Sequence, residues 1–240
     1  MIEYKTIDIP VDVCVTHFGN KYSSKYIDNL EKSIGKHYSS DFNFIVKTDC
    51  PYGHWDKMSF FDTYEPTIIM DIDFIVNSNL DDLFDYDVPE DTLAAFPRWW
   101  RKGGCTINGG FYKINPGTKT STACDKFYMD PDFWKDHYGR LVGTPGMGEQ
   151  NFVEESCPIQ YLPGQWYGMY ADGSSHVTSR TKGKALINQL NVDSMYFEAY
   201  GLDQTINKSF SDHIKLVHFI YDDNMIEDKE QWIQDLWNGM

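Results

Sequence analysis

The chain has 240 residues, of which 41% are hydrophobic and 16% aromatic, enough apolar material for the core of one large domain. Lysine and arginine number 21 against 36 aspartate and glutamate residues, so the formal net charge is −15. This charge makes a long nucleic acid an unfavourable main partner, because polyanions repel each other, but it does not exclude a nucleotide. No run of 18 or more apolar residues occurs, so no transmembrane segment is predicted.

The five cysteines are scattered and never spaced C-x-x-C, a pattern that predicts reduced thiols rather than a zinc site or a disulfide framework. The first ten residues, MIEYKTIDIP, lack the basic start and apolar middle of a signal peptide. We therefore expect a cytoplasmic protein.

Strands and helices are predicted to alternate along the first half of the chain. The Val-rich segment Val11–His17 predicts a strand, and SSKYIDNLEKSIGKHY predicts a helix that begins at Ser23 or Ser24. Short helices are predicted in HWDKMSFFDTY and from Asn77 or Ser78. Further strands are predicted at Phe42–Asp49, Pro66–Val76, Thr92–Pro97 and Ile107–Asn115. This alternation is typical of an α/β domain with a mostly parallel sheet.

The second half has fewer regular patterns. GMGEQNFVEES predicts a helix entered from a glycine-rich loop, whereas periodicity is weak from Trp166 to Phe210, as in a substrate loop or a mobile connection. His213–Ile220 predicts a buried strand, and EDKEQWIQDLW a terminal helix whose aromatic face packs on the core rather than on a membrane. Without a repeat or linker, residues 1–240 are predicted to form one domain.

Two carboxylates interrupt the apolar segment PTIIMDIDFIV. In a strand, Asp71 and Asp73 would project from the same face, and their repulsion calls for a divalent metal, a shared proton or a basic partner. The carboxyl ends of strands in open α/β sheets are where ligands bind, and Mg²⁺ or Mn²⁺ takes one or two carboxylates together with substrate phosphates. A metal site is one interpretation, and an exposed turn is the other.

Four polar residues elsewhere in the chain add to the metal interpretation. Lys57 can neutralise the acids or reach a phosphate, and Asn108 is followed by two glycines that permit close approach of a ligand. Gln150 lies near a helix N-terminus, and His218 ends an apolar strand, where an imidazole can ligate Mn²⁺. The structural alternatives are a surface lysine at Lys57, a β-bulge or turn at Asn108, an N-terminal capping role for Glu149 beside Gln150, and a core histidine at His218.

These motifs, in this order, resemble the nucleotide-sugar glycosyltransferases of the GT-A fold, and small bacterial and phage members in particular. The segments that carry the resemblance are VCVTHFGNKYSSKYIDNL, FIVKTDCPYG, HWDKMSFFDTYEPTIIMDIDFIV, NLDDLFDY, TINGGFYKINPG, GEQNFV, YLPGQWY and IKLVHF. The resemblance implies a Rossmann-like, mostly parallel central sheet flanked by helices. It also implies a donor half over about residues 11–117, and an acceptor half with the C-terminal strand and helix over about residues 118–240.

The resemblance also assigns roles to residues. Asp71 and Asp73, with Ile72 between them, match the D-x-D motif that holds Mn²⁺ or Mg²⁺ against the donor diphosphate, and His218 matches the third metal ligand of the glycogenin and galactosyltransferase type. Asn108 and Gly109 match the element beside the donor sugar. The nucleobase and ribose would be surrounded by Thr16, His17, Phe18, Gly19, Tyr22 and Asp49.

Glu149 and Gln150 match the pair that faces the sugar and the acceptor. Of the candidate catalytic residues, Glu149 and Asp125 can act as a base, whereas Gln150 cannot. In the family, this histidine begins the pattern H-x-x-G-x-x-K-P. Here Tyr221 stands at the position of the glycine, and no Lys-Pro follows. A retaining transfer is favoured, and this departure leaves both the stereochemistry and the metal role of His218 open.

The expected substrates are a nucleotide-diphosphate sugar, with a UDP-sugar favoured, and a glycan-type acceptor. Trp99, Trp100 and Arg101, in the segment RWWRKGG, offer stacking faces and positive charge for the acceptor, or else pack on the sheet. A modified base of phage DNA is an alternative acceptor. Two other functions stay open: a haloacid-dehalogenase-like phosphatase, which also uses a D-x-D motif with Mg²⁺, and a non-catalytic module that binds a nucleotide sugar or glycan.

Overall fold

The structure is a computed structural model that describes residues 10–98, 104–172, 184–188, 210, 212–219 and 225–239. Its strands are β1 Val11–Thr16, β2 Phe42–Lys47, β3 Thr67–Met70, β4 Phe74–Val76, β5 Thr92–Pro97, β6 Ile107–Asn115, β7 Ile159–Tyr161, β8 Tyr167–Asp172, β9 Lys184–Asn188 and β10 Leu216–His218. Its α-helices are α1 Ser24–His37, α2 Asp81–Phe84, α3 Thr118–Met129, α4 Pro131–Val142, α5 Glu149–Ser156 and α6 Gln231–Trp237. Its 3₁₀ helices are η1 Gly53–Phe61, η2 Gly164–Trp166 and η3 Ile226–Asp228.

The strands form two sheets. The larger one has the order β2-β1-β3-β6-β5-β7, in which β6 is antiparallel to both neighbours and the other pairs are parallel. This confirms the predicted mostly parallel α/β sheet. The smaller sheet, of order β4-β10-β8-β9, was not predicted, because it joins short strands from distant parts of the chain.

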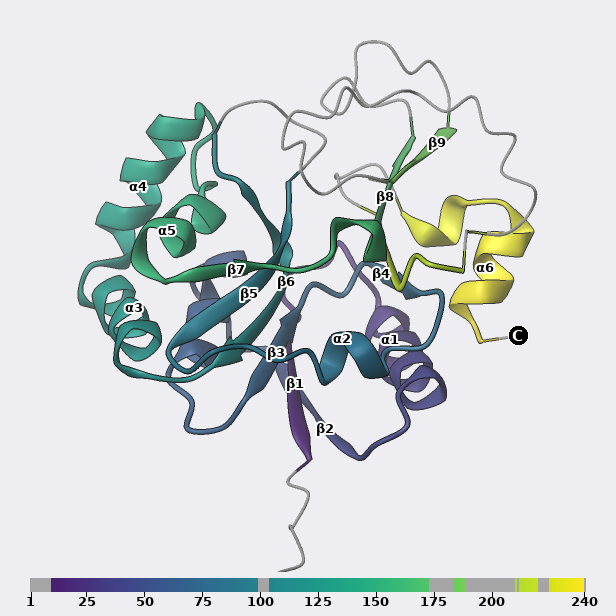
Figure 1. Cartoon of the computed structure of the whole chain (residues 1–240). Coiled ribbons are helices and arrows are strands. Elements are labelled where there is room, and N and C mark those ends of the chain that lie inside the picture. The colour runs from purple at the N-terminus through teal and green to yellow at the C-terminus, as the bar shows by residue number, and fades with distance from the viewer. Residues whose placement is uncertain are drawn as a thin grey trace, which may run out of the picture.

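Both faces of the larger sheet are covered, as the alternation of its side chains requires. Along β1, Val13 and Val15 enter one core, which also holds residues of α1 and α6, whereas Cys14 enters a second core shared with η1 and α3. Figure 1 shows the same division, with α3, α4 and α5 gathered on one side of the sheet and α1 and α6 on the other. Helix α1 begins after Ser23, as its sequence predicts.

The chain departs from the sequence-based expectations in its second half. Helices α3 and α4 were not predicted, although Asp130 caps α4 by accepting a hydrogen bond from the Phe133 amide, and Pro131 at the first position and Gly143 at the end are typical helix boundaries. The expectation of irregular chain from Trp166 to Phe210 is wrong for β8 and β9, which pair with each other.

The aromatic face of the last helix packs on the core. Ile233 and Trp237 of α6 are buried, and Trp232 and Leu236 pack against the same core, so the core interpretation of this face is confirmed. In the parts of the chain that the structure describes, no helix combines the length and the apolar character needed to cross a bilayer.

Candidate metal and active site

Asp71 and Asp73 lie where the chain passes from one sheet to the other. The prediction of one strand over Pro66–Val76 is wrong: β3 ends at Met70 and β4 begins at Phe74. The Asp71 amide still donates a hydrogen bond to the Gly110 carbonyl of β6, 2.8 Å away. After the two acids the chain pairs with a different strand: β4 pairs with β10, and Phe74 lies opposite His218. The change of ladder bends the chain, so the carboxylates converge through this bend and not through strand alternation.

The bend brings three possible metal ligands together. One ligand atom each from Asp71, Asp73 and His218 lies within 4.8 Å of the others. The His218 Nε2 atom is 3.0 Å from Asp73 Oδ1 and 3.9 Å from Asp71 Oδ2. Asp73 is buried, but its contact with the His218 imidazole and the hydrogen bond that it accepts from the Tyr22 hydroxyl more than offset the effect of burial and lower the pKa of Asp73. Asp73 is therefore held as a carboxylate.

Lys57 balances the negative charge of the bend. Its Nζ atom donates to Asp71 Oδ1 at 2.8 Å and to the Gly109 carbonyl at 2.7 Å, and lies 4.0 Å from Glu149 Oε2. Burial lowers the pKa of Lys57, but the carboxylates of Asp71 and Glu149 outweigh burial and raise it. Lys57 is thus a buried, charged side chain at the site and not the surface lysine of the alternative interpretation.

The two glycines after Asn108 leave room for other side chains of this protein. A Cβ atom on Gly110 would lie 2.5 Å from His218 Cε1, and one on Gly109 would lie 2.9 Å from Glu149 Oε2. The Asn108 Oδ1 atom accepts a hydrogen bond from the Gly110 amide at 2.9 Å, within the part of β6 where its register with β5 shifts, so Asn108 shapes the irregular backbone that receives His218. The absence of side chains at Gly109 and Gly110 therefore allows Glu149 and His218 to pack closely against this backbone.

Glu149 and Gln150 begin α5 and face the same backbone. Glu149 is 5% exposed, and its Oε1 atom accepts a hydrogen bond from the Tyr112 hydroxyl at 3.0 Å. Burial raises the pKa of Glu149 to about 7, while Lys57 acts in the opposite direction. The Gln150 Oε1 atom accepts a hydrogen bond from the Gly109 amide at 3.0 Å. Both side chains therefore pack against the backbone of Gly109 from helix α5.

The residues expected around the nucleotide lie at the same edge of the sheet as Asp71. Thr16 ends β1 and Asp49 follows β2, and both strands run parallel to β3, so their carboxyl ends meet. His17 Nε2 is 2.9 Å from the Tyr22 carbonyl oxygen, which closes the loop that contains Gly19. Phe18 is 40% exposed. This loop therefore presents an exposed aromatic side chain at the carboxyl edge of the sheet.

Tyr22 has a further contact that its sequence position did not suggest. Its hydroxyl donates to Asp73 Oδ2 at 2.8 Å, so it contacts one of the three possible metal ligands. Ile72, between the two acids, is buried at 5% exposure and anchors the bend in the core.

Some predicted site residues are not brought to this cluster. Asp125 is exposed on α3 and is not one of the three grouped ligands. Trp99, Trp100 and Arg101, the predicted acceptor residues, lie outside the described residues. Sequence reasoning missed Tyr112 and Tyr167, which contact Glu149 and His218 through their hydroxyls. No sequence signal identifies them, because Tyr112 of β6 meets Glu149 of α5 and Tyr167 of β8 meets His218 of β10, and these elements are far apart in the chain.

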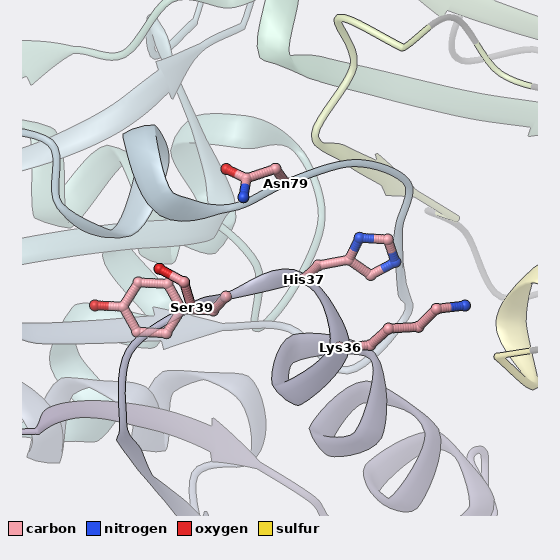
Figure 2. A pocket seen from close by; sticks show the side chains of 5 residues that line it. Lys36, His37, Ser39 and Asn79 are labelled. Carbon is pink, nitrogen blue, oxygen red and sulfur yellow. The ribbon is translucent and has the colours of Figure 1, made fainter.

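A shallow cavity of about 210 Å³ lies elsewhere, at the C-terminal end of α1. Figure 2 shows its lining residues, Lys36, His37, Tyr38, Ser39 and Asn79. Tyr22, which touches Asp73, lies just before the other end of this 14-residue helix. At 1.5 Å per residue, α1 separates the cavity from the carboxylates by about 20 Å. The cavity therefore does not belong to the metal site.

The fold, with Asp71 at the carboxyl edge of the sheet, is a GT-A fold, and it is similar to the folds of solved glycosyltransferases. The galactosyltransferase LgtC, solved with donor and acceptor sugar analogues, matches with a TM-score of 0.57 and 11% identity over 96% of each chain. The bifunctional glycosyltransferase WbbM matches with a TM-score of 0.52 and 11% identity, over 97% of this chain and 52% of WbbM. No family model and no curated protein sequence matches.

GlyE, a glycosyltransferase of Streptococcus pneumoniae TIGR4, matches with a TM-score of 0.48 and 17% identity over 65% of this chain. The chain spans 46% of GlyE and 52% of WbbM, about half of each, but nearly the whole of LgtC. The matches with LgtC and WbbM support the fold alone, because their identities to this chain are only 11%. Any statement about the reaction has to be argued from the side chains of the site.

Proposed function

We propose that this protein is a metal-dependent glycosyltransferase that transfers a sugar from a nucleotide-diphosphate sugar to a glycan-type hydroxyl acceptor. The observation that carries the proposal is the group formed by Asp71, Asp73 and His218 at the carboxyl edge of β3, in a GT-A fold. Lys57, Glu149 and Gln150 surround this group.

The three side chains fit a divalent cation. Ligands about 2.1 Å from an octahedral cation lie roughly 3 Å apart when adjacent and roughly 4 Å apart when opposite. The separations of 3.0 Å and 3.9 Å from His218 Nε2 to the two carboxylates lie in this range. Two carboxylates alone suit Mg²⁺, and an added imidazole suits Mn²⁺, so Mn²⁺ or Mg²⁺ is the proposed cofactor.

The chain's own residues provide the rest of the donor site. When bound, a divalent cation supplies Lewis-acid stabilisation of the negative charge that develops on the leaving diphosphate. Lys57 holds Asp71 in place and adds a fixed positive charge at the same edge. Phe18 offers an exposed ring to the base, and we favour a uridine nucleotide.

Glu149 and Gln150 position the sugar side of the site. A base in an inverting reaction has to reach the acceptor hydroxyl, but Glu149 is buried and bonded to Tyr112. This supports a retaining reaction in which the donor phosphate takes the acceptor proton. We propose that Gln150 and the Gly109 backbone that it holds line the sugar, and that Trp99, Trp100 and Arg101 meet a glycan acceptor.

Thermal-shift measurements with UDP-, GDP-, CMP- and TDP-sugars, each with and without Mn²⁺, test the proposal. A ligand at 100 times its Kd stabilises a protein by about 2.7 kcal/mol, which is roughly 5–10 °C in Tm for a chain of this size. We expect such a shift for one nucleotide, dependent on the cation. Asp73→Asn should abolish the shift and sugar-nucleotide hydrolysis while the fold is kept.

A matched control is Asp12→Asn, which removes the same charge near the start of β1, where Asp12 accepts a hydrogen bond from Asn43. It should leave the metal-dependent shift unchanged. An Asp73→Asn protein with wild-type Mn²⁺ affinity and turnover would contradict the proposal. Hydrolysis of p-nitrophenyl phosphate would indicate the phosphatase alternative, and cation-dependent binding without any turnover would indicate a binding module.

A further inference from the structure

The His218 imidazole has contacts on one face and at both ring nitrogens. Its ring stacks on Phe74, with centroids 4.2 Å apart and planes at 24°, and the missing side chain of Gly110 leaves space on its edge. Its Nε2 atom faces Asp73, and its Nδ1 atom lies 2.8 Å from the hydroxyl oxygen of Tyr167. The imidazole therefore has a hydrogen-bonding partner at each nitrogen.

The contact with Tyr167 matters because the two ring nitrogens have linked roles. A neutral imidazole carries one N–H donor and one acceptor nitrogen, and the nitrogen that ligates a metal must be the acceptor. Ligation through Nε2 therefore requires a proton on Nδ1 and a hydrogen-bond acceptor beside it. The Tyr167 hydroxyl oxygen can accept from Nδ1–H, and in the alternative tautomer its O–H can donate to Nδ1.

The position of Tyr167 is fixed by the smaller sheet and not by the metal ligands. Tyr167 begins β8, where it lies opposite Leu216 of β10, two residues before His218. Its side chain is fully buried, its ring contacts Phe96 with centroids 5.2 Å apart, and it meets the His218 ring edge-on at 86°. The sheet thus presents the hydroxyl to Nδ1 of His218.

We propose that Tyr167 is the positioning residue of the metal site: its hydroxyl accepts the Nδ1–H of His218, directs Nε2 toward the cation, and so gives the site its preference for Mn²⁺ over Mg²⁺. This inference rests on the metal site of the proposed function. Partners of this kind fix the tautomer and ring orientation of a ligating histidine, and their loss typically costs 10–100-fold in metal affinity. Mg²⁺ prefers oxygen ligands and depends less on the imidazole.

The test is the affinity of metal-free protein for Mn²⁺ and for Mg²⁺, measured by calorimetry in wild type and Tyr167→Phe. We expect Mn²⁺ affinity to fall by about 10–100-fold and Mg²⁺ affinity by much less, so that selectivity falls. Tyr138→Phe is the control, because Tyr138 is also buried and its hydroxyl donates to a carboxylate, that of Glu155, at 2.7 Å. It should leave both affinities unchanged.

A double-mutant cycle separates positioning from a general structural role. If Tyr167 acts through His218, Tyr167→Phe should have no further effect on Mn²⁺ affinity in a His218→Ala background. Additive losses would overturn the inference. Imidazole ¹⁵N shifts of wild type with Zn²⁺, a diamagnetic cation, need no variant: Nδ1–H is expected for His218, and a retained Nε2–H would overturn the inference.

The two proposals fail in different ways. A wild-type protein that binds neither cation, with or without nucleotide, overturns the proposed metal site and this inference with it. If wild type binds Mn²⁺ and His218→Ala weakens that binding, but Tyr167→Phe binds with wild-type affinity and selectivity, the metal site stands and the role of Tyr167 is overturned.

Discussion

Gly110→Ala tests whether close packing of the backbone against His218 builds the proposed metal site. The new Cβ atom would lie 2.5 Å from His218 Cε1 and 2.8 Å from Nδ1, whereas non-bonded carbon atoms prefer about 3.5–4.0 Å. The imidazole would have to move by about 1 Å. It has no simple way to do so, because its face stacks on Phe74 and its Nδ1 atom contacts the buried Tyr167 hydroxyl.

The expected consequences are a loss of stability and of metal affinity. Overpacking of this kind costs about 1–3 kcal/mol. Metal–ligand distances tolerate only about 0.2 Å, so a displacement five times larger should weaken Mn²⁺ binding by at least about tenfold. Urea unfolding of metal-free protein measures the first effect, and calorimetric titration with Mn²⁺ measures the second.

Gly35→Ala is the matched control, because it adds the same methyl group in helix α1, where the Cβ atom would lie 3.8 Å from the Phe42 ring. Alanine is favoured over glycine in a helix, so this variant should gain about 0.5–1 kcal/mol and bind Mn²⁺ normally. If Gly110→Ala kept wild-type stability and Mn²⁺ affinity, our explanation of the glycine pair would be refuted.

Three further predictions concern the surroundings of the site. Burial raises the pKa of Glu149 to about 7 from 4.5, so the protonated form stabilises the fold at low pH and this contribution is lost as the pH rises to about 7. In EDTA, the free energy of unfolding of Glu149→Gln should therefore rise by up to about 3 kcal/mol relative to that of wild type across this pH range. A difference between the two proteins that does not change with pH would contradict the prediction. Lys57→Met should destabilise metal-free protein by about 3–5 kcal/mol and enlarge the Mn²⁺-induced rise in Tm, because the cation replaces the lost ammonium charge. Gly148→Ala should cost about 2–5 kcal/mol in urea unfolding, since its φ is +102° and its Cβ would lie 2.7 Å from Tyr138 Cβ, whereas Gly146→Ala, with nothing within 4 Å, should cost clearly less.

The sequence by itself determined the elements whose cause is local. The alternation of apolar residues predicted β1, β5 and β6, helical spacing predicted α1, and the order of strands and helices predicted a mostly parallel sheet. It also indicated that Asp71 and Asp73 need a metal, a shared proton or a basic partner unless they begin an exposed turn, because an apolar segment rarely carries charges without partners. The resemblance to GT-A glycosyltransferases implied that His218 joins them.

Only the tertiary structure decided how these side chains meet. The bend at Asp71–Asp73 exists because β3 pairs with β6 and β4 pairs with β10, and strand alternation alone gives the wrong reason for the convergence. The contacts of Tyr22 with Asp73 and of Tyr167 with His218 each join residues 51 positions apart. Such contacts follow from how distant segments pack together, which no local sequence pattern encodes. The pairing of β4 with β10 brings the two acids and the histidine into one group, which is the proposed metal site.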